Sequence, residues 1–100
     1  QAAREYINCH YAEKISLDVL AREISVNKFY LQKLFRRSVG LSPNEYLATV
    51  RLQEAKRLLR STDLPISQIA MDVGFGSIGH FIELFKAREK MPPSVYRRRW

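Results

Sequence analysis

Three kinds of hydrogen-bond donor share one predicted helix, the segment "KFYLQKLFRRSVG" at residues 28–40. Phe29, Gln32, Lys33 and Arg36 stand three and four positions apart in this segment, so they fall on one helical face. Their amide, ammonium and guanidinium groups all donate hydrogen bonds, and two of the three are positively charged. This face is therefore suited to a ligand that offers acceptors and negative charge.

The charge along the chain points to the same kind of ligand. The net charge is +7, and residues 28–60 hold eight basic and two acidic residues, a net of +6, whereas residues 1–27 have a net of −1. A basic middle on a compact domain indicates a polyanionic partner. Basic residues that only solubilise helices would give the same count, so charge alone leaves both interpretations open.

Residue types that could support catalysis or metal binding are sparse. Cys9 is the only cysteine, and His10 and His80 are the only histidines, too few for a site of three or four ligands. We expect Cys9 to be a buried or half-buried residue near the end of the first helix. The serines stand at helix starts and form no Ser/His/Asp set, so we expect no enzyme, no metal and no cofactor.

Composition also limits the cellular setting. A single cysteine fits a reducing compartment, and no apolar run approaches the roughly 20 residues of a membrane span. We therefore expect a cytoplasmic protein without a membrane partner. Because the chain begins with Gln1 rather than Met, we also expect it to be part of a longer protein.

The apolar spacing is helical along nearly the whole chain, and no segment alternates long enough to predict a strand. We therefore expect an all-α fold of about seven helices. The predicted helix starts carry capping residues, namely Ser16, Asn27, Ser42, Ser67 and Ser77.

Three boundaries carry further signals. Pro43 takes the first helical position after Ser42, and Glu45 completes a capping box. Gly40 should end the preceding helix in the left-handed conformation, and Gly74 should supply the positive φ of a tight turn. A helix over residues 42–61 would be about 27–30 Å long at 1.5 Å per residue.

Residues fifty positions apart match in type, so the chain is built from two similar halves. The pairs are Asn27 with Ser77, Leu31 with Phe81, Leu34 with Leu84, Phe35 with Phe85, Pro43 with Pro93 and Tyr46 with Tyr96. Leu31, Leu34, Phe35 and Ser38 should face one core, and Phe81, Leu84 and Phe85 should face the other. Ala21 and Ala70 are small, as two closely crossing helices require.

This repeat predicts two helix-turn-helix units. The first covers residues 1–41, a linker helix covers residues 42–61, and the second unit covers residues 62–100. A plain helical hairpin would show a similar pattern, but two units and a basic middle favour nucleic acid. The linker is nearly as long as one turn of DNA, about 34 Å, so two recognition helices could enter successive major grooves.

Four segments resemble the DNA-binding domain of the AraC/XylS family of bacterial transcription regulators. They are "YLATVRLQEAKRLLRSTDLPISQIA", the "GF" at residues 74–75, "FIELFK" and "PPSVYR", and the resemblance covers roughly residues 3–98. It implies seven helices, sequence-specific binding of double-stranded DNA and a partnership with RNA polymerase. In this family the domain usually follows a sensor or dimerisation domain, which this chain would lack.

The resemblance also implies which residues meet DNA. In the first unit the base-contacting positions are Phe29, Gln32 and Lys33, whose side chains suit a thymine methyl, adenine and guanine respectively. In the second unit they are Ile78, Gly79, Ile82 and Glu83. Phosphate contacts are expected from Lys28, Arg36, Arg37, Arg51, Ser77, His80 and Lys86. For His80 a solvated or packing role is the alternative.

The second unit departs from the family pattern, which often has polar or basic residues there. Ile78 and Ile82 offer only apolar contact, and Glu83 would be repelled by phosphates unless it accepts from cytosine N4. Lys90 stands where the family commonly has glycine, so we expect that helix end to close differently. We hypothesise that the first unit supplies most base contacts and that the second unit mainly positions the domain.

Two alternatives stay open at this point. The fold could serve as a protein-interaction module with weakened base readout in its second unit. RNA binding would need an aromatic stacking surface, whereas Phe and Tyr fall mostly at core spacing. Basic residues outside the recognition segments have open roles: Lys56, Arg57 and Arg60 could face phosphates or solubilise the linker, and residues 97–99 could contact the DNA backbone or form a disordered tail.

Overall fold

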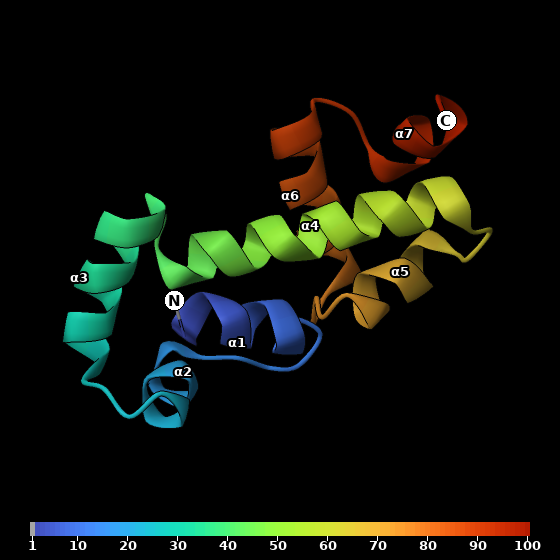
Figure 1. Ribbon diagram of the computed structural model, residues 1–100. Helices are drawn as coiled ribbons and strands as arrows, with labels where there is room; N and C mark the ends of the chain where they lie inside the picture. Colours follow the sequence, from blue (N-terminus) through green and yellow to red (C-terminus); the bar gives the residue numbers. More distant parts are fainter. Residues whose placement is uncertain (1) are drawn as a thin grey trace. The chain divides into compact units, whose positions relative to one another are not determined.

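The computed structural model describes residues 2–100, which form seven α-helices and no strand. The all-α prediction is therefore confirmed for the described part of the chain (Figure 1). The helices are α1 (Ala2–His10), α2 (Leu17–Glu23), α3 (Lys28–Val39), α4 (Pro43–Ser61), α5 (Ile66–Asp72), α6 (Ile78–Glu89) and α7 (Pro93–Arg98).

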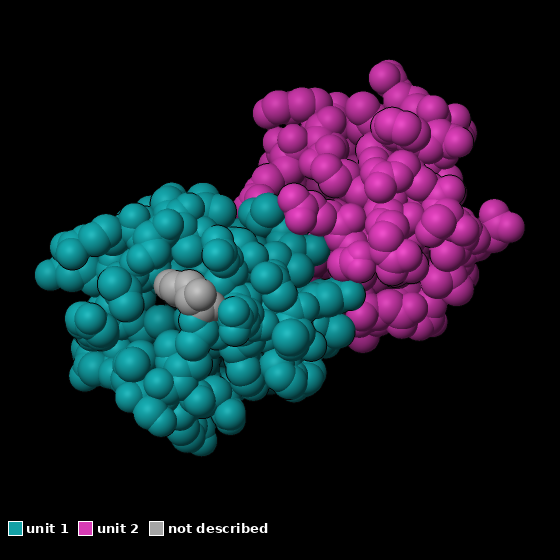
Figure 2. All heavy atoms as spheres, in the orientation of Figure 1, with its two compact units in different colours: residues 1–50 teal, residues 51–100 magenta. Residues whose placement is uncertain are grey.

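The chain divides into two compact units, Gln1–Val50 and Arg51–Trp100 (Figure 2). The boundary falls within α4, so the first half of this helix belongs to unit 1 and the second half to unit 2. The functional partition into residues 1–41, 42–61 and 62–100 stays a prediction.

Unit 1 has its own apolar core. Small and branched residues from α1, α2, α3 and α4 meet there, together with the fully buried Phe35. The buried members are Ala3, Ile7, Leu20, Ala21, Leu31, Phe35 and Leu47. Burial of Leu31 and Phe35 turns the opposite face of α3 toward solvent, which is the face that carries the predicted base-contacting residues.

Unit 2 is built around a run of aromatic rings. Phe75, Phe81, Phe85 and Tyr96 are buried, and successive ring centroids lie 5.2, 5.7 and 5.5 Å apart. Spacings in this range allow tilted and edge-to-face contacts between rings. This core anchors α6, and it leaves the first turn and outer face of that helix exposed.

The sequence repeat appears again as a repeated ring contact. Tyr46 meets Phe35 edge-on at 5.5 Å and 66°, and Tyr96 meets Phe85 at 5.5 Å and 69°. Both tyrosine hydroxyls have partners: Tyr46 Oη donates to Asn8 Oδ1 at 2.8 Å, while Tyr96 Oη accepts from Arg60 at 2.6 Å. Helices α3 and α6 therefore each contact the helix that follows through the same edge-on ring pair.

The two helix-turn-helix turns share one hydrogen-bond pattern. In the first turn Val26 N donates to Ala21 O at 3.0 Å, and in the second Phe75 N donates to Ala70 O at 2.9 Å. Both accepting residues are alanines buried in their cores, as the predicted close crossing of two helices requires.

A left-handed residue closes each turn. Ser25 has φ 59° and Gly74 has φ 105°, so the positive φ predicted for Gly74 is confirmed. Gly76 stands between Phe75 and the cap of α6 and is the one extra residue of the second turn. The serine shows that this position does not strictly require glycine, although a side chain there costs conformational energy.

Most predicted caps are confirmed. Ser16, Asn27 and Ser77 accept hydrogen bonds from backbone N–H groups of the first turn that follows. Ser67 is an incorrect prediction, because α5 begins at Ile66 and has Pro65 at its N-cap, with no side-chain hydrogen bond. The Pro65 carbonyl accepts the first helical hydrogen bond, from Ile69 N at 3.0 Å, so the helix starts before the serine.

Three further predictions are wrong. Ser38 is exposed and Val39 is partly buried instead, because Val39 lies one full turn after Phe35. Cys9 is exposed, because two residues along a helix rotate it about 200° away from buried Ile7. Lys90 closes α6 as glycine would, with φ 64° and a 2.9 Å hydrogen bond from its N–H to Lys86 O.

Candidate nucleic-acid interface

The exposed face of α3 forms an open hollow of about 490 Å³ lined by Phe29, Gln32, Lys33, Arg36 and Arg37. Phe29 is 71% exposed, an unusual placement for a large apolar ring. Three positive charges, an amide and an aromatic ring therefore converge on one surface. These five include all three base-contacting residues that sequence predicted for unit 1 and two of its predicted phosphate contacts.

Local structure orients this surface. Asn27 Oδ1 accepts hydrogen bonds from Phe29 N at 2.8 Å and from Tyr30 N at 3.3 Å, which fixes the start of α3. Gly40 ends the helix in the left-handed conformation with φ 86°. Both ends are therefore defined by the chain itself, and the buried apolar stripe sets the rotation of the helix about its axis.

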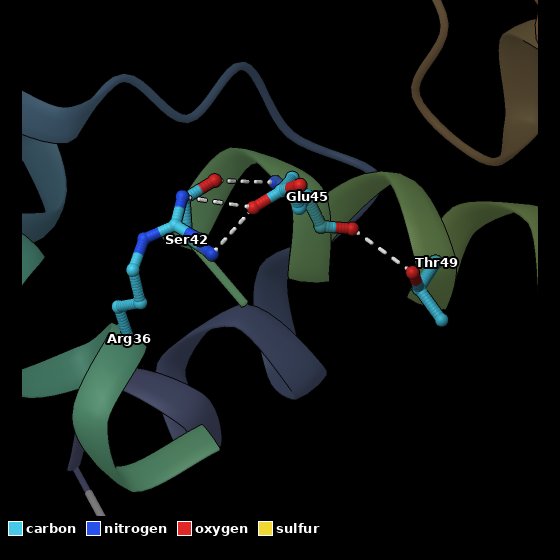
Figure 3. A network of polar contacts seen from close by, with 4 residues as sticks. All are labelled: Arg36, Ser42, Glu45 and Thr49. Carbon is cyan, nitrogen blue, oxygen red and sulfur yellow. Dashed lines mark hydrogen bonds and ion pairs between the residues drawn. The ribbon is translucent and has the colours of Figure 1, made fainter. Parts of the chain in front are cut away.

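Arg36 is held at the edge of the hollow by Glu45, the capping-box residue of α4 (Figure 3). One carboxylate oxygen, Glu45 Oε1, accepts from Ser42 N at 2.8 Å and from Arg36 Nη2 at 3.1 Å. Ser42 Oγ in turn accepts from Glu45 N at 3.2 Å, so the predicted capping box is confirmed. These hydrogen bonds, first that from Ser42 N, lower the pKa of the Glu45 carboxyl, and Arg36 adds to the effect.

The pair of Arg36 and Glu45 is not predictable from the sequence. The two residues are nine positions apart and lie on different helices, so no helical spacing connects them. Their side chains are 59% and 49% exposed, and an exposed pair of this kind adds little stability. Its main consequence is to restrict where the guanidinium lies.

Lys28, a predicted phosphate contact, lies beside the hollow. Its ammonium is 3.2 Å from Asp18 Oδ1 and 5.5 Å from the centroid of the Phe29 ring. The side chain is 42% exposed. A ligand phosphate would therefore have to share this ammonium with Asp18.

The corresponding face of α6 has a different character. Ile78 is 41% exposed, and Gly79 and Glu83 are exposed, whereas Ile82 is only half-exposed. Glycine in a helix costs about 1 kcal/mol relative to alanine. Apart from the exposed Glu83, the side chains on this face are short or partly buried, so most of them extend less far into solvent than those of α3.

The other predicted phosphate contacts of unit 2 lie in three settings. Ser77 Oγ accepts from His80 N at 3.2 Å and caps α6, and the exposed His80 ring meets the Phe75 ring edge-on at 5.8 Å. Lys86 is exposed in the last turn of α6. Arg51 is half-buried with its guanidinium 5.8 Å from the Phe75 ring centroid, and burial lowers its pKa.

Basic residues on the second half of α4 have partners within unit 2. Lys56 Nζ lies 3.3 Å from a Glu89 carboxylate oxygen in a half-buried ion pair, which joins α4 to the end of α6. Arg57 pairs with Glu54 at 2.8 Å. Arg60 donates to Tyr96 Oη, and its guanidinium lies 5.5 Å from the centroid of the Trp100 ring. Lys56, Arg57 and Arg60 therefore each have an interaction partner within the protein.

Arg97 binds the end of α4. Its Nε donates to Leu59 O at 3.2 Å and its Nη2 donates to Thr62 O at 3.3 Å. Helix ends leave several carbonyls without helical partners, and a guanidinium can supply donors to them. A disordered basic tail is therefore the wrong description for Arg97, which is half-buried and belongs to α7.

Residues 2–100 hold neither a metal-binding cluster nor a membrane-spanning helix. No group of three or more histidine, cysteine, aspartate or glutamate side chains is placed to hold a metal ion. No helix is both long enough and apolar enough to cross a membrane.

Comparison with known proteins agrees with the geometry of α2–α3 and α5–α6. A family model described as a helix-turn-helix domain matches residues 20–99. The structure of a probable AraC family transcriptional regulator from Rhodopseudomonas palustris superposes with a TM-score of 0.86 at 29% identity, over 98% of this chain and 93% of that one. The chain belongs to the AraC/XylS family.

Two relatives show how this AraC-type domain occurs in proteins of different length. The regulatory protein SoxS of Salmonella typhimurium is 36% identical over 99% of this chain and 92% of SoxS. The HTH-type transcriptional regulator YijO of Escherichia coli is 34% identical over all of this chain but only 35% of YijO. The chain therefore spans about a third of YijO's length and nearly all of SoxS.

One AraC-type neighbour was solved with nucleic acid. The DNA-binding domain of AdpA, in complex with a target DNA, superposes with a TM-score of 0.92 at 25% identity, over 96% of this chain and 86% of that one. The predicted family and the seven-helix fold are thus confirmed. The individual contact residues stay predictions.

Proposed function

We propose that this chain binds double-stranded DNA sequence-specifically as the DNA-binding domain of a bacterial transcriptional regulator. The observation that carries the proposal is the convergence of Phe29, Gln32, Lys33, Arg36 and Arg37 on one open surface of α3. Family membership supports it, because the family consists of transcriptional regulators. The comparisons do not favour the alternative of a protein-interaction module.

The chemistry of α3 suits the major groove. Lys33 can donate to guanine O6 and N7, Gln32 can pair with adenine N6 and N7, and Phe29 can pack on a thymine methyl group. Arg36 and Arg37 lie on the same hollow and can neutralise phosphates along its edge. In this proposal α3 supplies most of the base readout.

The role we propose for α6 is mainly to position the domain. Ile78 and Glu83 are exposed, but neither side chain donates a hydrogen bond. Ile82 is half-buried, so only part of its side chain is available for contact. The helix can therefore contribute apolar contact and one acceptor for cytosine N4, which is a narrower set of base contacts than α3 offers.

The proposal extends to the mode of docking and to partners. We infer that α3 and α6 enter successive major grooves, since each follows the same kind of turn fifty residues apart. We further propose RNA polymerase as a partner, a sensor or dimerisation domain elsewhere in the full-length protein, and a cytoplasmic location. We propose no catalytic reaction and no cofactor for this domain.

Selection of bound duplexes from a random library tests the proposal. We expect enriched sites with one strongly conserved box and a second, less conserved box about 10 base pairs away, one turn of B-form DNA. The logarithm of the binding constant for the selected duplex should then fall linearly with the logarithm of the salt concentration, because contacts to phosphates release counterions. Failure to enrich any duplex, or equal affinity for heparin and for single strands, would contradict the proposal.

A further inference from the structure

Gly79 differs most sharply from its counterpart in the repeat. It is exposed in the first turn of α6, and the fifty-residue offset aligns it with Phe29 of α3. Phe29 is 71% exposed and lines the hollow. One unit therefore presents a large ring at this position, and the other presents no side chain.

The fold does not require glycine at this position. The glycines with left-handed backbone are Gly40 and Gly74, whereas Gly79 is helical. A Cβ added to Gly79 would meet a single non-neighbouring atom within 4 Å, Ser77 Oγ at 3.7 Å, which is an ordinary contact. Alanine would therefore fit the unbound domain, and it would favour the helix more than glycine does.

The side chains near Gly79 indicate why the absence of a Cβ at this position would matter for DNA binding. Ile82 lies one turn along the same face and is half-buried, and the exposed Ile78 side chain is short compared with the Gln32 and Lys33 side chains of α3. Glu83 is the one long exposed side chain of this face, and it carries an acceptor but no donor. The two isoleucines reach base edges only if the helix backbone itself lies close to the groove. A helix can lie closest where it carries no Cβ.

We propose that Gly79 is a contact position that acts through its lack of a side chain: the DNA reaches van der Waals distance of its Cα, and any Cβ would hold α6 away. This inference rests on the proposed DNA binding. It gives the two units different ways of meeting the duplex, by extended side chains from α3 and by close backbone approach from α6.

The substitution Gly79→Ala tests the inference, because it predicts effects of opposite sign on stability and on binding. The midpoint of thermal unfolding should rise by about 2–6 °C, as expected for glycine to alanine at a compatible helical site. Affinity for the duplex selected by the wild-type chain, measured by fluorescence anisotropy at fixed salt, should fall by about tenfold, or about 1.4 kcal/mol.

Gly76→Ala is the matched control. It adds the same methyl group three residues earlier, outside α6, where a Cβ would meet nothing within 4 Å. Its affinity should equal that of the wild type. The inference is overturned if Gly79→Ala keeps the wild-type affinity or has a lowered unfolding midpoint. It is also overturned if Gly76→Ala loses as much affinity for the duplex as Gly79→Ala does. A wild-type chain that selects no duplex would instead overturn the proposed function, and the inference with it.

Discussion

Lys90 ends α6 in the same left-handed backbone conformation in which Gly40 ends α3. The two residues have φ values of 64° and 86°, and each N–H donates to the carbonyl four residues earlier at 2.9 Å. Glycine adopts this conformation without steric cost, whereas a residue with a Cβ is strained by roughly 1–2 kcal/mol. The second unit therefore carries strain at a position where the first unit has none.

Lys90→Gly should stabilise the protein by about 1 kcal/mol, because it relieves this strain at some cost in unfolded-state entropy. Urea unfolding of the wild type and the variant would measure the change. Gly40→Lys is the reciprocal test and should destabilise by a similar amount. A loss of stability in Lys90→Gly would contradict the prediction and would mean that the hydrogen bond from Lys90 Nζ to Ala87 O, 3.2 Å, outweighs the strain.

Gln32→Ala and Lys33→Ala should each weaken binding to the selected duplex by about 1–3 kcal/mol and relax its sequence preference, since each removes a proposed base contact. Ile82→Ala and Glu83→Ala should change the preference much less. Anisotropy titrations against the selected duplex and single-base variants of it would measure both effects. The asymmetric readout is wrong if the α3 variants keep the wild-type preference while the α6 variants lose it.

Arg97→Met should destabilise the domain by about 1–3 kcal/mol, because it removes a charged donor from two carbonyls at the end of α4. Chemical denaturation would measure the loss. The neighbouring Arg98 is exposed, so Arg98→Met is a matched control and should change stability by less than about 0.5 kcal/mol. Equal effects of the two substitutions would show that the Arg97 contacts do not stabilise the fold.

Stability should fall at acidic pH partly through Glu45. Its pKa in the folded protein is lowered from the ordinary value of 4.5, chiefly by the hydrogen bond from Ser42 N. The folded state therefore gains stability above that ordinary value and loses the gain as pH falls through the lowered pKa. Glu45→Gln cannot ionise, so its deficit relative to the wild type should shrink as pH drops from about 6 toward 3. Unfolding free energies measured across this range would refute the prediction if the deficit grew.

Several features of the fold follow from residues close together in sequence. Ser16, Asn27 and Ser77 cap helices through hydrogen bonds that span two or three residues, and Ser42 with Glu45 forms a capping box over three. Such interactions depend on the local backbone alone. The seven helices, the repeated units and the composition of the α3 face were therefore predictable from the sequence.

Where the sequence prediction failed, a competing interaction decided the outcome. Helix α5 begins ahead of Ser67 because the Pro65 carbonyl already accepts the first helical hydrogen bond. Lys90 is left-handed despite its side chain, because the chain must leave α6 there and begin α7 three residues later. Local preference is a weak constraint, and packing of the neighbouring helices can override it.

The sequence by itself determined the number of helices and which face of α3 carries donors. Only the tertiary structure decided that Arg36 lies against Glu45, that Arg97 binds the end of α4 at Leu59, and that Ile82 is half-buried. The physical reason is the distance along the chain over which each kind of interaction acts. Capping and apolar periodicity act over three or four residues, whereas these partners are brought together by the way whole helices pack, which no short stretch of sequence specifies.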